Sequence, residues 1–506
     1  MKHLLEIAQI IHRVKGRKSD VFEDGVGGLS SKNSKFNEFY EALLAGRYKN
    51  DRDAATHLYG CSPTDDRYRQ LKSRFRKRLL NTLFAIDQYQ TAATSAYERA
   101  VFQCNKDWAL VRILATHDAP HTAADIARGV LNTALKFHLT EFVLNPARTL
   151  REYTLHHGTE QDFEVYDALV REYSQIFEAE VRSESICHRV MLHHQLQTTP
   201  AKKEAFRDEI VQASNDLERL YEKFKSPDLY VNCVVIRACR CETERDWNGI
   251  LAICREFDQF VLQHPHFQHH KKIEKLWLKK FGAYLHLRDF SRGRLDAERL
   301  LQSVPEGDSF WFMTLDRYFL LAMHTGQFAE AKAIYERAAN HSKFRKLPAA
   351  EREKWQIYDT YLNLFVYRDG NEGGTVKLPG KNGKSLSESI VTAKDNRLLA
   401  VHHSVVQVVN AIAQDNYIGA AGQIDQLKSL ANRQFKTDQP GRTLQFIRLL
   451  QHLAKSGFTN LNHNGTAQAF AELRRIPFHY SGVVQDLEVV PYERIWEEIV
   501  HNLQGN

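Results

Sequence analysis

The sequence predicts an all-α fold in which antiparallel helix pairs stack into an α-solenoid. Apolar residues recur at helical spacing along almost the whole chain of 506 residues, and no sustained alternation of apolar and polar residues indicates a β-sheet. Proline (12 residues) and glycine (25 residues) are scarce, which favours helix. The predicted helices follow one another across short breaks, such as residues 62–66 and 304–308, so sequence neighbours are expected to pack antiparallel.

The first 16 residues, MKHLLEIAQIIHRVKG, have an apolar stretch that Glu6 and Gln9 interrupt. They are expected to form a short amphipathic helix and not a signal peptide. No run reaches the roughly 18 apolar residues that a membrane span requires. The seven cysteines form an odd set at irregular spacing, which is typical of reduced thiols and not of a disulfide framework. We therefore expect a soluble, cytoplasmic protein.

Positive charge is concentrated near the N-terminus. Residues 1–90 carry 17 basic and 11 acidic side chains, which account for +6 of the formal net charge of +7. In the segment DDRYRQLKSRFRKRLLNTLFAID, residues 65–87, seven Lys or Arg side chains fall between positions 67 and 78 with no acidic residue among them. The excess charge is therefore a local property of this segment and not of the whole surface.

On a helix this basic segment is amphipathic. Its apolar stripe consists of Tyr68, Leu71, Phe75, Leu79, Leu83 and Ile86. Six of the seven basic residues lie outside the stripe, and only Lys72 lies near its edge. These six are the predicted contacts to a partner or to nucleic acid: Arg67, Arg69, Arg74, Arg76, Lys77 and Arg78.

Three interpretations of the basic segment stay open. In the first, the charges are solvated or pair with nearby acids, for which the candidates are Glu38, Glu41, Asp51 and Asp53. In the second, residues 51–60 and 67–87 form a helix-turn-helix-like pair that binds nucleic acid, although the connection exceeds the usual length of about three or four residues and no aromatic platform flanks it. In the third, the segment contacts an acidic protein or a membrane surface.

Residues 319–338, FLLAMHTGQFAEAKAIYERA, contain the clearest repeat signal. Gly326, Phe328, Ala331, Tyr335 and Ala338 fall at the spacings of the second half of a tetratricopeptide repeat, and the segment resembles that family. Gly326 permits a tight turn between two helices, and Ala331 allows them to approach closely. Phe328 and Tyr335 are expected to fill the groove between the helices.

Weaker copies of this pattern occur at residues 246–257, 289–300 and 415–427. The aromatic anchors Trp247, Phe290 and Phe328 are 43 and 38 residues apart, more than the roughly 34 residues of a regular repeat. Degenerate repeats of variable length are therefore expected. The alternative is that any antiparallel helix pair places small residues where its backbones approach.

Two Gly-rich polar stretches, residues 25–35 and 369–387, interrupt the helical pattern. The second is expected to form a small projecting β-hairpin or a loop. Pro491 is expected to open a last helix that covers the final repeat with Ile495, Trp496 and Ile499. The predicted segments are an N-terminal helix and flexible linker (1–35), a basic helical module (36–95), tetratricopeptide-like repeats (96–368), a loop insertion (369–397) and C-terminal helical repeats with a capping helix (398–506).

The whole chain resembles a group of uncharacterised bacterial helical-repeat proteins. The likeness is carried by the block around residues 58–87, LYG followed by DRYRQLKSRFRKRLLNTLFAID, and by the ending VVPYERIWE at residues 489–497. This resemblance implies a helical-repeat fold. It brings no known activity, so it bears on the fold and not on the function.

No motif indicates a catalytic, cofactor or metal site. Residues 379–385, PGKNGKS, end like a phosphate-binding loop but have Leu378 where the first glycine is required, and residues 25–28, GVGG, lack the third glycine of a dinucleotide-binding motif. His266 and His270 are spaced by one helical turn, but no HExxH motif or acidic ligand accompanies them. Cys239 and Cys241 would point about 200° apart on a helix, which disfavours a zinc or redox pair. We expect no catalytic residue, no cofactor and no bound metal.

These observations lead to two expected functions. The first is a non-enzymatic scaffold or adaptor that binds a protein or peptide on a helical-repeat surface. The alternative is a nucleic-acid-binding regulator, in which the basic helix-turn-helix-like module is joined to a helical-repeat sensor domain.

Overall fold

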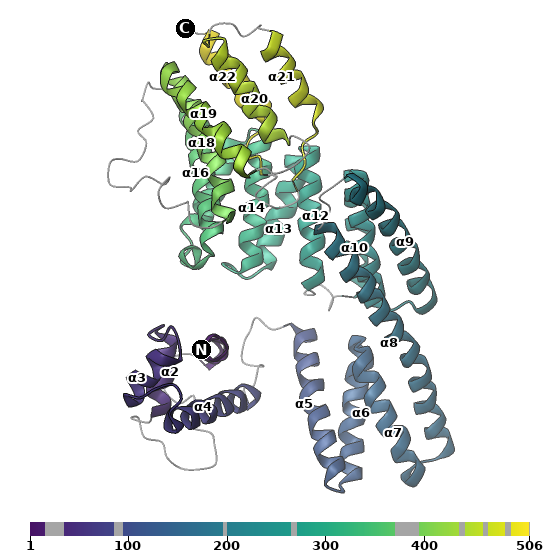
Figure 1. Cartoon of the computed structure of the whole chain (residues 1–506). Coiled ribbons are helices and arrows are strands. Elements are labelled where there is room, and N and C mark those ends of the chain that lie inside the picture. The colour runs from purple at the N-terminus through teal and green to yellow at the C-terminus, as the bar shows by residue number, and fades with distance from the viewer. Residues whose placement is uncertain are drawn as a thin grey trace. The chain divides into compact units, whose positions relative to one another are not determined.

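The computed structural model describes residues 1–15, 35–85, 95–195, 200–264, 271–369, 394–434, 441–458, 464–480 and 487–504. In these ranges it contains 21 α-helices and one short 3-10 helix, with no β-strand (Figure 1). The all-α prediction is therefore confirmed. The predicted β-hairpin near 369–387 lies outside the described residues, apart from Asp369 at the end of a helix, and residues 394–397 of the predicted insertion already belong to the next helix.

The chain divides into two compact units, Met1–Phe137 and His138–Asn506. The first unit begins with four helices that share one core: α1 (Lys2–Lys15), α2 (Lys35–Leu44), α3 (Asp51–Tyr59) and α4 (Asp66–Ala85). We call these four helices the N-terminal module. The sequence analysis assigned α1 to a separate segment, whereas in the structure α1 packs against both α2 and α4. A further antiparallel pair completes the unit: α5 (Ala96–Thr116) and α6 (Pro120–Phe137).

The second unit consists of the remaining helices (Figure 1). They are α7 (Thr140–His157), α8 (Glu160–Gln195), α9 (Pro200–Phe224), α10 (Pro227–Glu244), α11 (Trp247–Gln263), α12 (Lys271–Leu287), α13 (Phe290–Ser303), α14 (Ser309–His324), α15 (Phe328–Ala339), η3 (Phe344–Lys346), α16 (Ala349–Asp369), α18 (Lys394–Ala413), α19 (Tyr417–Gln434), α20 (Arg442–Lys455), α21 (Asn464–Arg475) and α22 (Tyr492–Gln504). Helices α10 and α11 form one pair, and α12 and α13 form the next. Helix α10 packs against its partner α11 and against α12, and α12 packs against its partner α13 and against α14.

Helix pairs in this unit are joined by one recurring turn. A residue one or two positions after the first helix has a left-handed backbone in the turns at Arg245 (φ 60°), Arg288 (φ 53°), Gly326 (φ 73°) and Asp415 (φ 56°). The N–H of the following residue then bonds a carbonyl five positions back, as in Asp246 N to Cys241 O (2.8 Å). The same bond closes the other three turns, between Asp289 and Tyr284, Gln327 and Ala322, and Asn416 and Ala411.

The second helix of each of these pairs begins with an aromatic residue. Trp247, Phe290, Phe328 and Tyr417 occupy this first position and pack onto the core of the unit. These positions are those of the strong repeat signal and its three weaker copies, so the four segments share one turn structure. Three of the roles that were predicted within residues 319–338 are confirmed, because Gly326 makes the turn and Ala331 and Phe328 are buried, whereas Tyr335 is half-buried.

The C-terminal end of the chain closes the unit. Helix α22 packs against α18, α20 and α21, and it buries Ile495, Trp496 and Ile499, as predicted. The segment between α21 and α22 also reaches back to α12 and α14: the ring of Phe478 lies 5.0 Å from that of His286 and 4.6 Å from that of His324. This part of the surface of the helix stack is therefore covered by the protein's own chain.

We expect Gly326→Ala to lower the free energy of unfolding by about 1–2 kcal/mol. A side chain strains the left-handed backbone at φ 73°. A Cβ here would also lie 2.5 Å from Nη1 of Arg494, whose guanidinium sits 4.8 Å from the centre of the Phe328 ring. The change is measured as the shift in the urea or thermal midpoint. The matched control is Gly422→Ala in α19, where nothing lies within 4 Å of the added Cβ, and this variant is expected to be unchanged or more stable.

Candidate nucleic-acid interface

Helix α4 is anchored in the N-terminal module by one fully buried face. Tyr68, Leu71, Phe75 and Leu79 are at most 7% exposed. The Phe75 ring stacks on Phe39 of α2 with 4.5 Å between ring centroids. The predicted apolar stripe is confirmed for these four residues, Leu83 is half-buried, and Ile86 lies outside the described residues. Because this face is held in the core, the orientation of the opposite face of α4 is also set.

The part of α4 outside this buried stripe carries the six basic residues that the sequence analysis singled out. We call them the cationic face: Arg67, Arg69, Arg74, Arg76, Lys77 and Arg78. The first five are exposed, whereas Arg78 is half-buried with its guanidinium 5.6 Å from the centre of the Phe36 ring. The structure thus places all six on one helix, where the sequence predicted them.

The N-terminal end of the cationic face is partly neutralised by its own helix start. Arg67 makes two hydrogen bonds to the carboxylate of Asp65, at 3.1 and 3.0 Å, and these bonds raise the pKa of the guanidinium. Arg69 forms a longer ion pair with Asp66 at 3.4 Å. Since these pairs are solvent-exposed, each contributes little to stability and can exchange for another anion.

The middle of the cationic face has no such pairing. In the ranges that the structure describes, no carboxylate forms an ion pair with Arg74, Arg76 or Lys77. These three side chains occupy about one turn of helix and all are exposed. The described part of the chain therefore leaves their charge to be compensated by solvent and counter-ions.

The acidic residues that were predicted to pair with the basic segment are mostly engaged elsewhere. Asp51 binds Lys72 (2.7 Å) and accepts a hydrogen bond from the hydroxyl of Tyr68 (2.7 Å). Burial acts to raise the pKa of Asp51, but these two hydrogen bonds outweigh it and hold the pKa below its ordinary value. Glu38 pairs with Lys35, and Asp53 accepts the backbone N–H of Lys49. Intramolecular pairing thus accounts for Lys72 and not for the middle of the cationic face.

A groove of about 750 Å³ runs between α1 and α4, beside the cationic face. Leu4 and Ile7 of α1 form its apolar side, and Arg69, Lys72 and Arg76 lie along α4. Gln70 and Ser73 also line it. The sequence analysis missed the contribution of α1 and these two polar residues, although the amphipathic pattern of residues 1–16 and the position of both polar residues on the charged side of α4 could have indicated them.

The order of α3 and α4 matches the predicted helix-turn-helix-like pair. Gly60 ends α3 in a left-handed conformation (φ 62°), and its N–H bonds Thr56 O at 2.9 Å. Residues 60–65 connect the two helices, which is longer than the usual turn of about three or four residues. The arrangement therefore shares the helix order of that motif but not its short turn.

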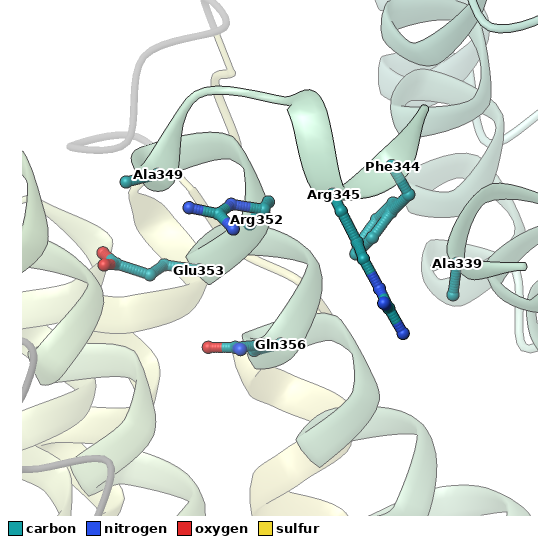
Figure 2. A pocket seen from close by; sticks show the side chains of 7 residues that line it. All are labelled: Ala339, Phe344, Arg345, Ala349, Arg352, Glu353 and Gln356. Carbon is teal, nitrogen blue, oxygen red and sulfur yellow. The ribbon is translucent and has the colours of Figure 1, made fainter. Parts of the chain in front are cut away.

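A second concavity, of about 500 Å³, lies at the start of α16 (Figure 2). Arg345 and Arg352 line it together with Glu353, and Phe344 and two alanines supply apolar surface. Burial raises the pKa of the Glu353 carboxyl. Two cations and one carboxyl on an apolar floor do not form a nucleophile–base pair, so this concavity suggests no reaction.

A buried carboxyl joins three helices of the second unit. Glu180 of α8 accepts hydrogen bonds from Thr140 Oγ1 (2.9 Å) at the start of α7 and from Ser226 Oγ (2.5 Å) at the start of α10. Burial raises the pKa of Glu180 to about 7, against the lowering effect of the Ser226 hydrogen bond. A carboxyl between two helix N-termini ties the helices together, and we assign it a structural role.

Arg442 of α20 is the centre of a second buried polar cluster. Its guanidinium pairs with Glu488 (2.7 Å) and Glu493 (2.6 Å) and donates to the backbone carbonyl of Ile476 (2.6 Å). The Glu488 carboxylate also accepts the backbone N–H of Tyr492 at 2.9 Å. These contacts fasten the end of α21, the segment that follows it, and the start of α22 to one side chain.

The other residues that the sequence analysis examined do not form a reactive site in the described ranges. Cys239 is buried and Cys241 half-buried, and burial raises the pKa of both thiols, which opposes thiolate formation. No cluster of His, Cys, Asp and Glu among the described residues could hold a metal ion. His266 and His270, the glycines at 25–28 and residues 379–385 lie outside those ranges.

The comparisons with known proteins add no family. No protein-family model, no curated protein and no solved structure matches the chain. Where side chains are described, none of the helices has the length and apolar character needed to cross a membrane.

We expect the contribution of Glu180 to the stability of the protein to fall as the pH rises from about 5 to 8. The folded pKa of Glu180 (about 7) lies above the ordinary value of 4.5, so its contribution is complete below the ordinary value and is lost as the pH passes the folded value. The loss is up to about 3 kcal/mol. Glu180→Gln keeps an oxygen acceptor for both hydroxyls and should flatten this part of the pH profile in urea unfolding. If the unfolding free energy of this variant depended on pH as steeply as that of the wild-type protein, the raised pKa assigned to Glu180 would be contradicted.

We expect Arg442→Ala to cost about 3–5 kcal/mol of stability, because it leaves two carboxylates unpaired in a buried cluster. The measurement is urea unfolding followed by circular dichroism. The control is Arg128→Ala, which removes an exposed ion pair with Asp125 and should change stability by less than about 1 kcal/mol. Equal losses of unfolding free energy in the two variants would show that the buried cluster stabilises the protein no more than an exposed ion pair does.

Proposed function

We propose that this protein binds nucleic acid through the cationic face of α4, in a binding and not a catalytic role. The observation that carries the proposal is the set of exposed side chains Arg74, Arg76 and Lys77, which have no ion-pair partner among the described residues. Phosphate groups of a nucleic acid supply the missing negative charge, and the release of their counter-ions favours binding. Arginine, which dominates the segment, also matches the bidentate geometry of phosphate.

The framework of α4 supports this role. The buried stripe holds the helix rigidly, so the cations are displayed without the cost of ordering a loop. Among the described residues, Arg67 and Arg69 form ion pairs with Asp65 and Asp66 at the start of their own helix, and such surface pairs can exchange for a contact to phosphate. The charge of the module also attracts a polyanion over a distance of about 10 Å at 0.1 M salt.

A second candidate function is the protein-binding scaffold, for which the recurring turn is the specific support. We propose that α10–α20 form a tetratricopeptide-like solenoid, because four turns share a left-handed residue followed by an aromatic helix start. Such stacks present extended binding surfaces. Part of the surface at α12 and α14 is covered by the protein's own chain, so a partner would bind elsewhere on the stack.

We also propose that the protein lies in the cytoplasm, because its seven cysteines are free thiols, which are typical of a reducing compartment.

The proposed function is tested by fluorescence anisotropy with labelled nucleic acids at 50–200 mM salt. The double variant Arg74→Glu with Arg76→Glu is expected to weaken binding by roughly tenfold or more, and to reduce the slope of log K against log salt by about two. The control is Arg182→Glu with Arg189→Glu, which makes the same charge change at exposed positions of α8.

The proposed function is supported if the control variant binds nucleic acid as tightly as the wild-type protein does and the α4 variant binds it more weakly. Equal loss in the two variants, or no salt-dependent binding by the wild-type protein, would remove it. Capture of a defined protein partner that survives the α4 changes would then favour the scaffold function.

A further inference from the structure

We infer that the ligand of the cationic face is duplex DNA and that α4 contacts it in the major groove. This inference rests on the proposed function and specifies its ligand. It is carried by the distribution of residues around α4, by the exposure of a polar strip on that helix, and by the burial of its aromatic rings.

The polar strip consists of Gln70, Ser73 and Lys77. With about 100° per residue, these positions cluster roughly opposite the buried stripe that is centred on Phe75. All three side chains are exposed. They therefore project furthest from the core of the N-terminal module.

Cations flank the strip on both sides. Arg69 and Arg76 lie about 70–90° from the centre of the strip on the side of α1, along the groove between the two helices, whereas Lys72, which pairs with Asp51, lies further round toward the buried stripe. On the other side, at a similar angle, are Arg67, Arg74 and Arg78. Viewed along its axis, α4 thus has a polar edge between two rows of positive charge.

The major groove of B-form DNA has the matching arrangement. It is about 12 Å wide and admits an α-helix of about 10–12 Å diameter, with a phosphate backbone along each wall. A polar edge between two cationic rows faces the bases, while the rows face the two backbones. Gln binds adenine, Lys binds guanine, and Ser binds either.

Other nucleic acids fit this surface less well. The major groove of duplex RNA is too deep and narrow for a helix, and single strands are held by stacking on exposed aromatic rings. Tyr68 and Phe75, the aromatic residues of α4 whose side chains are described, are only 1% and 0% exposed. A membrane surface would require apolar residues on the exposed edge, and of the described side chains on that edge only Leu80 (42% exposed) is a large apolar one.

The acidic helix start limits the contact to the middle of α4. Asp65 and Asp66 would repel phosphate, and they are held close to the N-terminus of the helix by Arg67 and Arg69. The closest approach to DNA is therefore expected between Gln70 and Lys77, a stretch of α4 that contains no carboxylate.

The test uses the full chain and four labelled probes of equal length: a duplex DNA pool of randomised sequence, a duplex RNA, a single-stranded DNA and a single-stranded RNA. At fixed salt, the duplex DNA is expected to bind at least tenfold more tightly than the other three. Sequences selected from the pool then serve to test two variants, after circular dichroism has shown that both are folded.

Gln70→Ala is expected to reduce the preference for the selected sequence by about tenfold, because it removes a contact to a base edge, and to leave binding to the unselected pool unchanged. Arg74→Ala is expected to weaken binding to the selected sequence and to the unselected pool by a similar factor, because phosphate contacts carry no sequence information.

The outcomes separate this inference from the proposed function. Equal or tighter binding of RNA or of a single strand overturns the duplex DNA assignment but leaves nucleic-acid binding in place. An unchanged sequence preference in Gln70→Ala overturns the assignment of the polar strip. Absence of salt-dependent binding to every probe removes the inference and the proposed function together.

Discussion

Burial of one apolar face per helix is the constraint on which the rest of this structure depends. In the N-terminal module, Phe75 stacks on Phe39 and Tyr68 is fully buried, so α4 cannot rotate about its axis without exposing aromatic rings. Exposing one such ring would cost on the order of 2 kcal/mol. The position of the charged side chains follows from this burial: whatever lies opposite Phe75 must face solvent. The cationic face is therefore a consequence of packing, and its rigidity is what makes it suitable as a binding surface.

In the second unit the same constraint acts through a repeated turn. Each left-handed residue reverses the chain within a few positions, so that the aromatic residue at the start of the second helix packs onto the core. Gly326 adopts this conformation without strain, whereas Arg245, Arg288 and Asp415 adopt it at some cost. The geometry at these three turns is therefore maintained by the packing of the helices and not by local preference. Arg442 and its two carboxylates then attach the final helix to the stack.

The electrostatics of the two units differ in kind. In the second unit, several charged groups are buried and paired, as in the contact between Lys354 and Asp316 at 3.0 Å, and we assign these pairs a structural role. On the cationic face of α4, five of the six positive side chains are exposed, and among the described residues Arg67 and Arg69 form ion pairs. Exposed ion pairs contribute little to stability, so the concentration of arginine on this helix has no explanation in the stability of the fold. The proposed recognition of an anionic ligand would explain it, and we infer from the polar strip between the two cationic rows that this ligand has two backbones.

The amino-acid sequence by itself determined the helical fold, the apolar stripe of α4, the turn at Gly326 and the membership of the cationic face, because each of these follows from residue spacing within a single helix or turn. It could not determine which acids meet which bases. Asp51 pairs with Lys72 and not with the middle of the cationic face, α1 lies along α4, and the ring nitrogen of His324 lies 2.5 Å from the backbone oxygen of Glu488, 164 positions away. Helical periodicity says which side of a helix is buried but not which neighbour covers it. Only the tertiary packing of segments distant in the chain decided those contacts.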